Sequence, residues 1–429
     1  MRKKSQKPIL AESWQPTVLG KLADYINGYG FAPSDWNETG IPIIRIEQLK
    51  GPHTKCDYYD KVLPENYLIE NGDLIFSWSA SLFLIIWDRG KAYLNQHLFK
   101  VKPKANTDKA FLKYLIEFNL GKLNYAAHGS TMRHITRPTL LKFEVNVPTR
   151  EIEQAKIAEI ILTVDEAIDT TDKLIEKYKR IKQGMMQDLF HYGIDENDNI
   201  RSEKTHKFKD SPLGRIPEKW DALNVGQITT HVGSGATPTG GQAVYLNEGV
   251  KFVRSQNVTF EGIDESDIVF IDAKTHKKMK RSEIFSKDIL LNITGASIGR
   301  CCIVPDNFGL ANVNQHVCAV RLKEKNEYFS KYVSYVLSSY IGQHQIDILN
   351  AGGNREGLNY QQVKAMIIPV PKQSSEVLQI TTIISGCENV ITNEVGHKQK
   401  LEALKRGLID NLLSGKVRVT KLIGGKNEN

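Results

Sequence analysis

The second half of this 429-residue chain repeats the first, and this repeat constrains the fold more than any other feature. Four short segments of the first half recur in the second in the same order, at offsets of 205 to 223 positions. They are residues 28–33 with 233–238, Asn95-Gln96-His97 with Asn314-Gln315-His316, Val147-Pro148 with Val370-Pro371, and 182–185 with 405–408. A period this long is unsuited to a solenoid, so the pattern predicts two copies of one domain with its appendage.

A long amphipathic helix is predicted as the appendage of each copy. Pro148 and Pro371 precede it, where proline is tolerated, and Glu151 and Glu153 suit the N-terminal dipole of the first helix. Apolar residues then recur at alternating steps of three and four, as in a coiled-coil seam, and each helix would be about 60 Å long. The predicted seam residues are Ile157, Ile161, Val164, Ile168, Ile175, Tyr178, Met185, Leu189, Ile380, Ile384, Cys387, Ile391, Leu401, Leu408 and Leu412.

Two arrangements suit these stripes: each helix packs on its own globular domain, or the two helices pack on each other. The second is favoured, because the stripes are copies of one another and each far exceeds the usual helix of about 11–12 residues. We therefore expect a mixed α/β (α+β) fold with two homologous domains separated by an antiparallel coiled coil, related by a pseudo-twofold repeat. The expected divisions are domain 1 (1–150), central helix (151–192), linker (193–215), domain 2 (216–372), C-terminal helix (373–415) and a frayed tail (416–429).

The globular parts are expected to mix strands with short helices. Strands are predicted at 42–46, 73–76, 83–87, 250–254, 288–293, 301–304 and 316–322. Helices are predicted at 108–118 and 328–341.

Composition narrows the class of protein. Hydrophobic residues make up 41% and charged residues 25%, which is typical of a globular chain. The longest apolar run, 82–87, is far shorter than the roughly 20 residues that span a bilayer, and no signal-like stretch follows the basic start. The five cysteines are odd in number and form no C-x-x-C pair, which fits free thiols in a reducing cytoplasm. A cytoplasmic protein without a membrane anchor is expected.

Positive charge is concentrated outside the helices. The chain has a net charge of +8, yet segment 151–192 has six basic against nine acidic residues and segment 373–415 has four against five. The globular parts therefore carry +12, and nucleic acid is a plausible partner for them.

Catalytic motifs are absent from the sequence. There is no Walker A pattern and no Asn-Pro-Pro-Tyr methyltransferase motif. Asp165-Glu166-Ala167 falls inside the helical stripe, and Asp272-Ala273-Lys274 has no second carboxylate at a nuclease spacing, so a surface loop is favoured there. His316 and Cys318, near Cys301, fit no common zinc spacing. We expect a non-catalytic chain without a metal or cofactor of its own.

The duplicated halves, the proline-then-helix units and residues 208–220 (Phe-Lys-Asp-Ser-Pro-Leu-Gly-Arg-Ile-Pro-Glu-Lys-Trp) resemble the specificity subunit of Type I restriction–modification systems. The resemblance extends from about Trp14 to Gly415 and includes the Asn-Gln-His trio and the loop 352–355. The family often has glutamine entering the helix; Gln154 fits this, but Val377 takes the matching place in the second copy.

The resemblance implies two target-recognition domains, each of which binds one half of a split double-stranded DNA site. It also implies that the helices set the spacer and dock two modification subunits, which bind S-adenosylmethionine. Restriction subunits that use ATP and Mg would join them. The alternatives are a related Type IIB-like system, a coiled-coil scaffold without DNA reading, and a self-sufficient nuclease or methyltransferase, which the missing motifs disfavour.

Candidate DNA contacts lie in loops and strand ends of both halves, because Arg, Asn and Gln read base edges and small hydroxyls suit phosphates. The glycine-rich turns can equally be plain connections, the arginines after strands can form sheet-edge salt bridges, and the Asn-Gln-His trios can brace the sheet. The candidates are Tyr29, Arg45, Gln48, Ser77, Ser79, Gln96, Arg133, Ser234, Thr237, Arg254, Gln256, Asn257, Thr294, Ser297, Arg300, Gln315 and Arg355.

Overall fold

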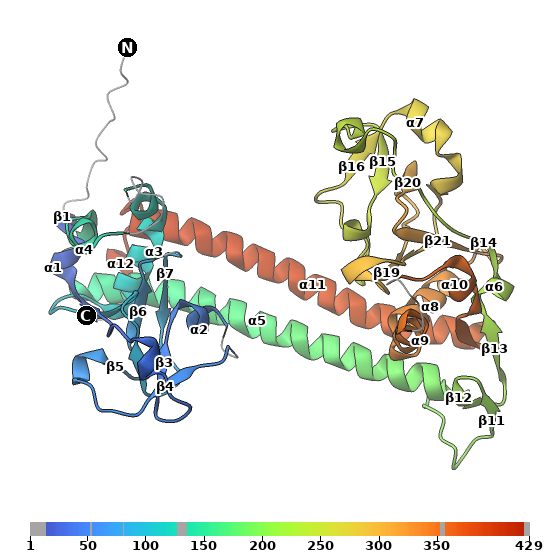
Figure 1. The fold of residues 1–429 in the computed structure, drawn as a ribbon, viewed down its shortest axis with the longest axis horizontal. Coiled ribbons are helices and arrows are strands. Elements are labelled where there is room, and N and C mark those ends of the chain that lie inside the picture. Colours follow the sequence, from blue (N-terminus) through green and yellow to red (C-terminus); the bar gives the residue numbers. More distant parts are fainter. Residues whose placement is uncertain (1–13, 52–53, 80, 127–134, 352–356, 424–429) are drawn as a thin grey trace, which may run out of the picture. The chain divides into compact units, whose positions relative to one another are not determined.

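The computed structural model describes residues 14–51, 54–79, 81–126, 135–351 and 357–423 (Figure 1). The chain divides into two compact units, which we describe separately. Unit 1 consists of residues 1–172 and 396–429, and unit 2 of residues 173–395. Each unit thus combines one globular part with one half of each long helix.

Three small sheets build the globular part of unit 1. The first is the antiparallel pair β1 (Trp14–Val18) and β10 (Glu144–Pro148), which brings the two ends of the domain together. The second, in the order β2-β9-β6-β7, contains β2 (Ala23–Asn27), β9 (Leu98–Pro103), β6 (Leu74–Ser77) and β7 (Phe83–Ile86). The third, in the order β4-β3-β8-β5, contains β4 (Asp57–Tyr59), β3 (Ile41–Ile44), β8 (Ala92–Leu94) and β5 (Leu68–Ile69).

Unit 2 repeats this topology strand for strand, which confirms the duplication. The closing pair is β13 (Trp220–Asn224) with β22 (Ile367–Pro371). The next sheet contains, in order, β14 (Thr229–Ser234), β21 (Val317–Leu322), β18 (Ile289–Asn292) and β19 (Cys301–Ile303). The last contains β16 (Val269–Ile271), β15 (Val250–Val253), β20 (Ala311–Val313) and β17 (Glu283–Ile284). The two central strands of this last sheet are parallel in both units, as β3 with β8 and β15 with β20.

Shorter helices complete both units. In unit 1 they are α1 (Leu19–Leu22), α2 (Ile46–Lys50), α3 (Lys109–Ala126), α4 (Arg137–Leu141) and α12 (Thr420–Ile423). In unit 2 they are α6 (Val225–Ile228), α7 (Ala273–Lys278), α8 (Glu327–Ser338), α9 (Tyr340–Ala351) and α10 (Tyr360–Ala365), preceded by the hairpin of β11 (Phe208–Ser211) and β12 (Gly214–Pro217).

The single helix predicted at 328–341 is wrong. The chain is extended at Ser339, which separates α8 from α9. Gly342 then lies so close to Leu337 that a Cβ would come within 2.3 Å of its carbonyl oxygen. The break allows α9 to turn back and pack against α8. Local helix propensity does not predict such a tertiary contact.

The two expected long helices are present and antiparallel. They are α5 (Glu151–Tyr192) and α11 (Ser374–Leu413). In unit 1, Asp165 of α5 pairs with Lys405 at 2.6 Å and Asp172 pairs with Lys398 at 2.7 Å. In unit 2, Lys182 pairs with Glu388 at 2.5 Å. Residue numbers fall in α11 as they rise in α5, so the helices run in opposite directions.

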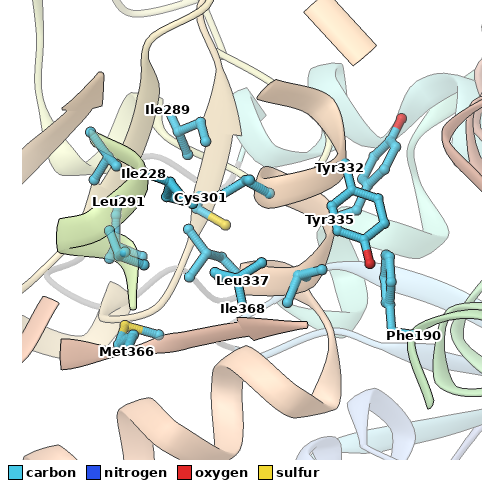
Figure 2. Packing of buried hydrophobic residues seen from close by; sticks show 14 of the residues in the cluster. Phe190, Ile228, Ile289, Leu291, Cys301, Tyr332, Tyr335, Leu337, Met366 and Ile368 are labelled. Carbon is cyan, nitrogen blue, oxygen red and sulfur yellow. The ribbon is translucent and has the colours of Figure 1, made fainter. Parts of the chain in front are cut away.

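The ends of both long helices also enter the domain cores. In unit 1, Ile157 and Ile161 of α5 and Leu412 of α11 belong to one buried cluster with the sheet. In unit 2, Phe190 of α5 packs edge-on against Tyr332 of α8 at 5.3 Å (Figure 2). Burying a side chain of this size contributes about 1.5–3 kcal/mol. Both arrangements weighed for the stripe are therefore realised, on different parts of the helices.

A duplicated ionic site joins each domain to both long helices. In unit 1, Tyr114 of α3 donates to Asp165 at 2.5 Å, and Lys405 pairs with the same carboxylate. Burial and the Asp165 carboxylate raise the pKa of Tyr114, so the phenol remains a donor. In unit 2, Tyr335 of α8 donates to Glu388 at 2.5 Å, and Lys182 pairs with Glu388.

A second duplicated ion pair involves a glutamate in the first turn of each long helix. In unit 2, the buried Glu376 of α11 forms two hydrogen bonds with Arg201, which follows α5. In unit 1, Glu153 of α5 accepts from Arg418 at 2.7 and 2.8 Å. Arg418 follows α11. In each unit, therefore, the segment after the C-terminus of one long helix folds back on the N-terminus of the other.

The fraying expected for 416–429 is consequently wrong for the described residues Lys416 to Ile423. Val419 is buried in the unit 1 core, and Arg418 is held by Glu153. The segment is short and rich in charge, which suggested fraying. It is ordered because apolar side chains such as Val419 pack into the unit 1 core.

Replacing Ile168 by aspartate should destabilise unit 1 by about 2–3 kcal/mol, whereas Glu166→Lys should change stability by less than about 0.5 kcal/mol. Ile168 is half-buried and lies between Asp165 and Asp172, both of which pair with α11, while Glu166 is exposed. Urea titration of the two variants measures the difference. Equal midpoints and slopes would contradict the predicted seam.

Candidate nucleic-acid interface

The carboxyl ends of several strands of unit 2 meet at one edge. The backbone N–H of Asn314, which follows β20, donates to Val253 O of β15 at 3.1 Å. The buried Asn292 at the end of β18 donates to Ser255 O at 2.8 Å, and Ile293 N donates to His316 O at 3.0 Å. We call this group of loops, residues 233–238, 254–257, 293–297, 314–316 and 357–360, the loop edge of unit 2.

Side-chain hydrogen bonds connect the candidates of this loop edge. Ser234 bonds to Tyr360 at 2.6 Å, and Thr237 bonds to Gln315. Gln315 bonds to His316 at 2.9 Å, and the other ring nitrogen of His316 bonds to Thr294 at 2.5 Å. Thr237 and Gln315 are exposed, whereas Ser234 and Thr294 are half-buried. The structure thus connects three predicted contact residues, Thr237, Gln315 and Thr294, in one network, while Ser234 bonds separately to Tyr360 on the same loop edge.

Unit 1 has the equivalent loop edge, built on the same backbone contacts. Asn95 N donates to Ile44 O at 3.0 Å, as Asn314 N does to Val253 O. Ile135 N donates to Trp78 O at 3.3 Å, as Leu358 N does to Ile293 O at 2.8 Å. Gln96 is exposed, and Tyr29 packs against Phe31 with ring centroids 5.0 Å apart. The two edges share a framework but present different side chains.

The two candidate serines at the end of β6 and just after it are less accessible. Ser77 and Ser79 are both buried, and Ser77 Oγ donates to Ser81 O at 2.7 Å. In unit 2, Ser297 is half-buried and accepts from Asn292 at 3.1 Å, while Arg300 is exposed. Arg133 and Arg355 lie outside the described residues.

The arginines after β3 and β15 have acidic partners. Arg45 pairs with Asp57 at 2.6 Å and stacks on Trp36 at 4.6 Å. Arg254 pairs with Asp267 at 3.2 Å, and Gln256 bonds to the same carboxylate. These contacts match the sheet-edge salt bridge that was the alternative to DNA contact.

Two of the predicted polar contacts instead hold turns. The buried Gln48 accepts the backbone amide of Arg45 at 3.0 Å, and the buried Asn257 accepts that of Arg254 at 2.9 Å. Neither amide faces solvent, so both serve the fold. The trios divide similarly: Asn95 and Asn314 are buried, while the glutamines that follow them are exposed.

Sequence comparison identifies the family. A sequence model described as the Type I restriction modification DNA specificity domain matches residues 11–180 and 217–403. The chain belongs to this family. We therefore call the globular parts from β1 to β10 and from β13 to β22 the first and second specificity domains.

Individual relatives and solved structures of this family match this chain over most of its length. The chain is 27% identical to a putative type I restriction enzyme MjaX specificity subunit of Methanocaldococcus jannaschii, over 97% of this chain and 96% of that protein. It is 24% identical to the EcoBI specificity subunit of Escherichia coli, over 84% and 76% of the two chains. The crystal structure of an S subunit from M. genitalium has the same fold, with a TM-score of 0.58 at 15% identity, over 96% of this chain and 98% of that chain.

The helix-entry position in which the two specificity domains differ has a structural role. Gln154 donates to Pro148 O at 3.1 Å and accepts from Asp108 N at 3.1 Å, so it joins the helix entry to the start of α3. Val377 is buried in the apolar core of unit 2 at the matching place. One copy fills the position with hydrogen bonds and the other with apolar packing.

Sequence reasoning missed α7 of the second specificity domain. Asp272, the carboxylate of the disfavoured nuclease interpretation, caps α7 by accepting from Thr275 N at 2.6 Å. The bonds from Thr275, with nearby lysines, lower the pKa of Asp272. Five basic residues follow between 274 and 281, and this density was the signal available in the sequence.

The cysteines and histidines of the described residues form no group of three with Asp or Glu that suits a metal ion. Burial raises the pKa of Cys301 to about 11 and that of Cys318 to about 12, so these thiols stay protonated at neutral pH. In the same part of the chain, no helix is both long and apolar enough to cross a membrane.

Proposed function

We propose that this chain is the DNA specificity subunit of a Type I restriction–modification complex, in which each specificity domain binds one half of a bipartite DNA site. The duplicated loop edge carries the proposal. Two domains share one backbone framework, and each exposes hydrogen-bonding side chains on it, such as Gln96 and Gln315. The chain supplies sequence recognition, and catalysis belongs to other subunits.

Different side chains on one framework suit two different half-sites. The second domain presents hydroxyls and an amide, as in Thr237 and Gln315, whereas the first presents Gln96 beside the Tyr29 aromatic group. Amides bond to base edges in the major groove, and hydroxyls bond to bases or phosphates. The half-sites should therefore differ in sequence.

The helix pair is proposed to set the spacer and to dock two modification subunits. The ion pairs Asp165–Lys405 and Lys182–Glu388 each join the two long helices beside a domain, which resists sliding of one helix along the other. The docked subunits would bind S-adenosylmethionine, and restriction subunits would bring ATP and Mg.

Genome-wide mapping of N6-methyladenine tests this function in a host that carries the chain and its partner subunits. A bipartite motif with an unspecific spacer is expected, and it should vanish when this chain is deleted. The purified chain alone should transfer no methyl group from S-adenosylmethionine to DNA. A methylation motif that survives the deletion would show that the chain does not determine the sequence, which would leave only a scaffold role. Methyl transfer by the purified chain alone would show that it is an enzyme.

Lengthening both long helices is expected to lengthen the spacer. Four residues inserted in each helix, near Thr171 and near Glu394, add about 6 Å at 1.5 Å per residue. DNA rises about 3.4 Å per base pair, so the spacer should grow by about one or two base pairs while both half-sites persist. The methylation motif of the variant is the measurement.

Insertion in one helix alone is the matched control for this experiment. It should break the register of the ion pairs on one side of the insertion and destabilise the chain. An active doubly lengthened variant that keeps the original spacer would show that another part of the complex fixes the separation.

A further inference from the structure

We propose that α7 and the turn after it form a phosphate-binding platform, which anchors the second specificity domain to the DNA backbone more strongly than the first. The platform comprises residues 272–282, and Figure 1 shows α7 beside β15, β16 and β20. The inference rests on the proposed function and deepens it, because it assigns a role that the loop edges do not fill.

The charges of the platform are exposed and largely free of acidic partners. Lys274, Lys277, Lys278, Lys280 and Arg281 are all exposed. Within the part of the chain that the structure describes, the only salt bridge from these five joins Lys280 to Glu283, at 3.5 Å. Like charges three or four residues apart on a helix repel one another. A polyanion would relieve this repulsion.

The platform is held rigidly on the sheet. His276 Nδ1 bonds to Asn312 of β20 at 2.7 Å. The amide of Asn312 donates to Met279 O at 3.0 Å and to Ser282 Oγ at 2.9 Å. Asn312 is fully buried, so its bonds are shielded from water. A braced helix presents its lysines without the ordering cost of a loose loop.

The platform adjoins the loop edge of its own domain. A Cβ added to Gly235 would lie 3.0 Å from Ser282 Cβ and 1.6 Å from Val313 O, so the loop 233–238 passes directly over the end of the platform. DNA held against Thr237 and Gln315 would bring its phosphates near these lysines. Such contacts position the duplex and carry no base information.

The first specificity domain has no counterpart in its described residues. The matching connection between β4 and β5, residues 60–67, contains Lys61 against Asp60 and Glu65, and ends in a single turn of 3-10 helix. The second domain has five basic residues against one acidic residue in 272–282. The two specificity domains should therefore differ in affinity for the DNA phosphate backbone as well as in the bases that they recognise.

The test compares two triple variants in the complete complex with the modification subunits. The platform variant is Lys274→Gln, Lys277→Gln and Lys278→Gln. The control variant is Lys204→Gln, Lys207→Gln and Lys325→Gln, which removes three exposed lysines of unit 2 that lie outside the platform and the loop edge. Glutamine keeps helix propensity close to that of lysine, and matching melting temperatures check that both variants fold.

Binding to a random-sequence 40-base-pair duplex is measured across a salt series. The slope of log affinity against log salt should fall by about two to three units in the platform variant, at about 0.9 per lost phosphate contact, and should not change in the control. The methylation motif should be the same in both. A platform variant with the wild-type slope would overturn the inference while an intact bipartite motif still supported the proposed function.

Two further outcomes also decide the matter. A second half-site that changes in the platform variant would mean that α7 reads bases, which contradicts a phosphate platform. Failure of the wild-type complex both to bind the duplex and to methylate a bipartite motif would refute the proposed function, and the platform with it.

Discussion

Replacing Glu376 by alanine is expected to destabilise unit 2 by about 3–5 kcal/mol. The side chains of Glu376 and Arg201 are only 5% and 9% exposed, and the carboxylate also accepts Ile194 N at 3.0 Å. The substitution would leave a buried guanidinium and a buried amide without their acceptor, which costs more than the ion pair itself contributes. Scanning calorimetry of the full chain measures the loss as a lower melting temperature for the unit 2 transition.

Matched variants separate the buried charge from a general effect of removing a glutamate. Glu196→Ala, at a side chain 81% exposed, should change stability by less than about 0.5 kcal/mol. Arg201→Met combined with Glu376→Leu should recover much of the loss, because neither partner is then left charged and alone. The structure would be contradicted if Glu376→Ala and Glu196→Ala melted alike.

Exchanging residues 216–372 for the same segment of another family member should replace one half-site completely and leave the other unchanged. The exchanged segment contains both strands of the β13·β22 pair, from Trp220 to Pro371, so the closure of the domain is transferred intact. Its loop edge also forms all its described contacts within the segment, as in Ser234 with Tyr360. The measurement is the methylation motif of the host.

The donor segment must keep the packing surface for the long helices. Tyr332 contacts Phe190 of α5, and Tyr335 bonds to Glu388 of α11, so a donor with tyrosine at both places is the suitable choice. As a control, exchange of residues 208–214 of the β11·β12 hairpin alone should leave the motif unchanged, because the hairpin lies outside both loop edges. Two half-sites that changed together would rule out independent reading by two domains.

Sequence alone determined the duplication and the two long helices of this chain. The duplication follows from matched segments in order, and the long helices follow from a three-four apolar period that no strand can satisfy. The shared sheet topology of both units confirms the first inference, and α5 and α11 confirm the second. Such features are local or repetitive, so they can be read without knowing which residues meet in space.

The candidate site was predictable only in part. The glycine-rich turns and the Asn-Gln-His trios do meet at one edge in each domain, as in Gln315 with Thr237. Arg45 and Arg254, by contrast, are candidates only because of their residue type. Their partners Asp57 and Asp267 lie on neighbouring segments that sequence could not pair with them. An arginine has the same sequence signature whether its partner is a phosphate or a carboxylate.

Tertiary structure decided what the polar interruptions of the helical stripes do. Lys182 and Lys405 break an apolar pattern, and sequence could identify them only as exceptions. In the fold they pair with Glu388 and Asp165, which are more than 200 residues away along the chain. Periodicity records which face of a helix is buried, whereas the identity of an ionic partner depends on the register of two antiparallel helices. That register is set by packing in three dimensions, because the energy of a partly buried charge depends on the groups around it and not on its neighbours in sequence.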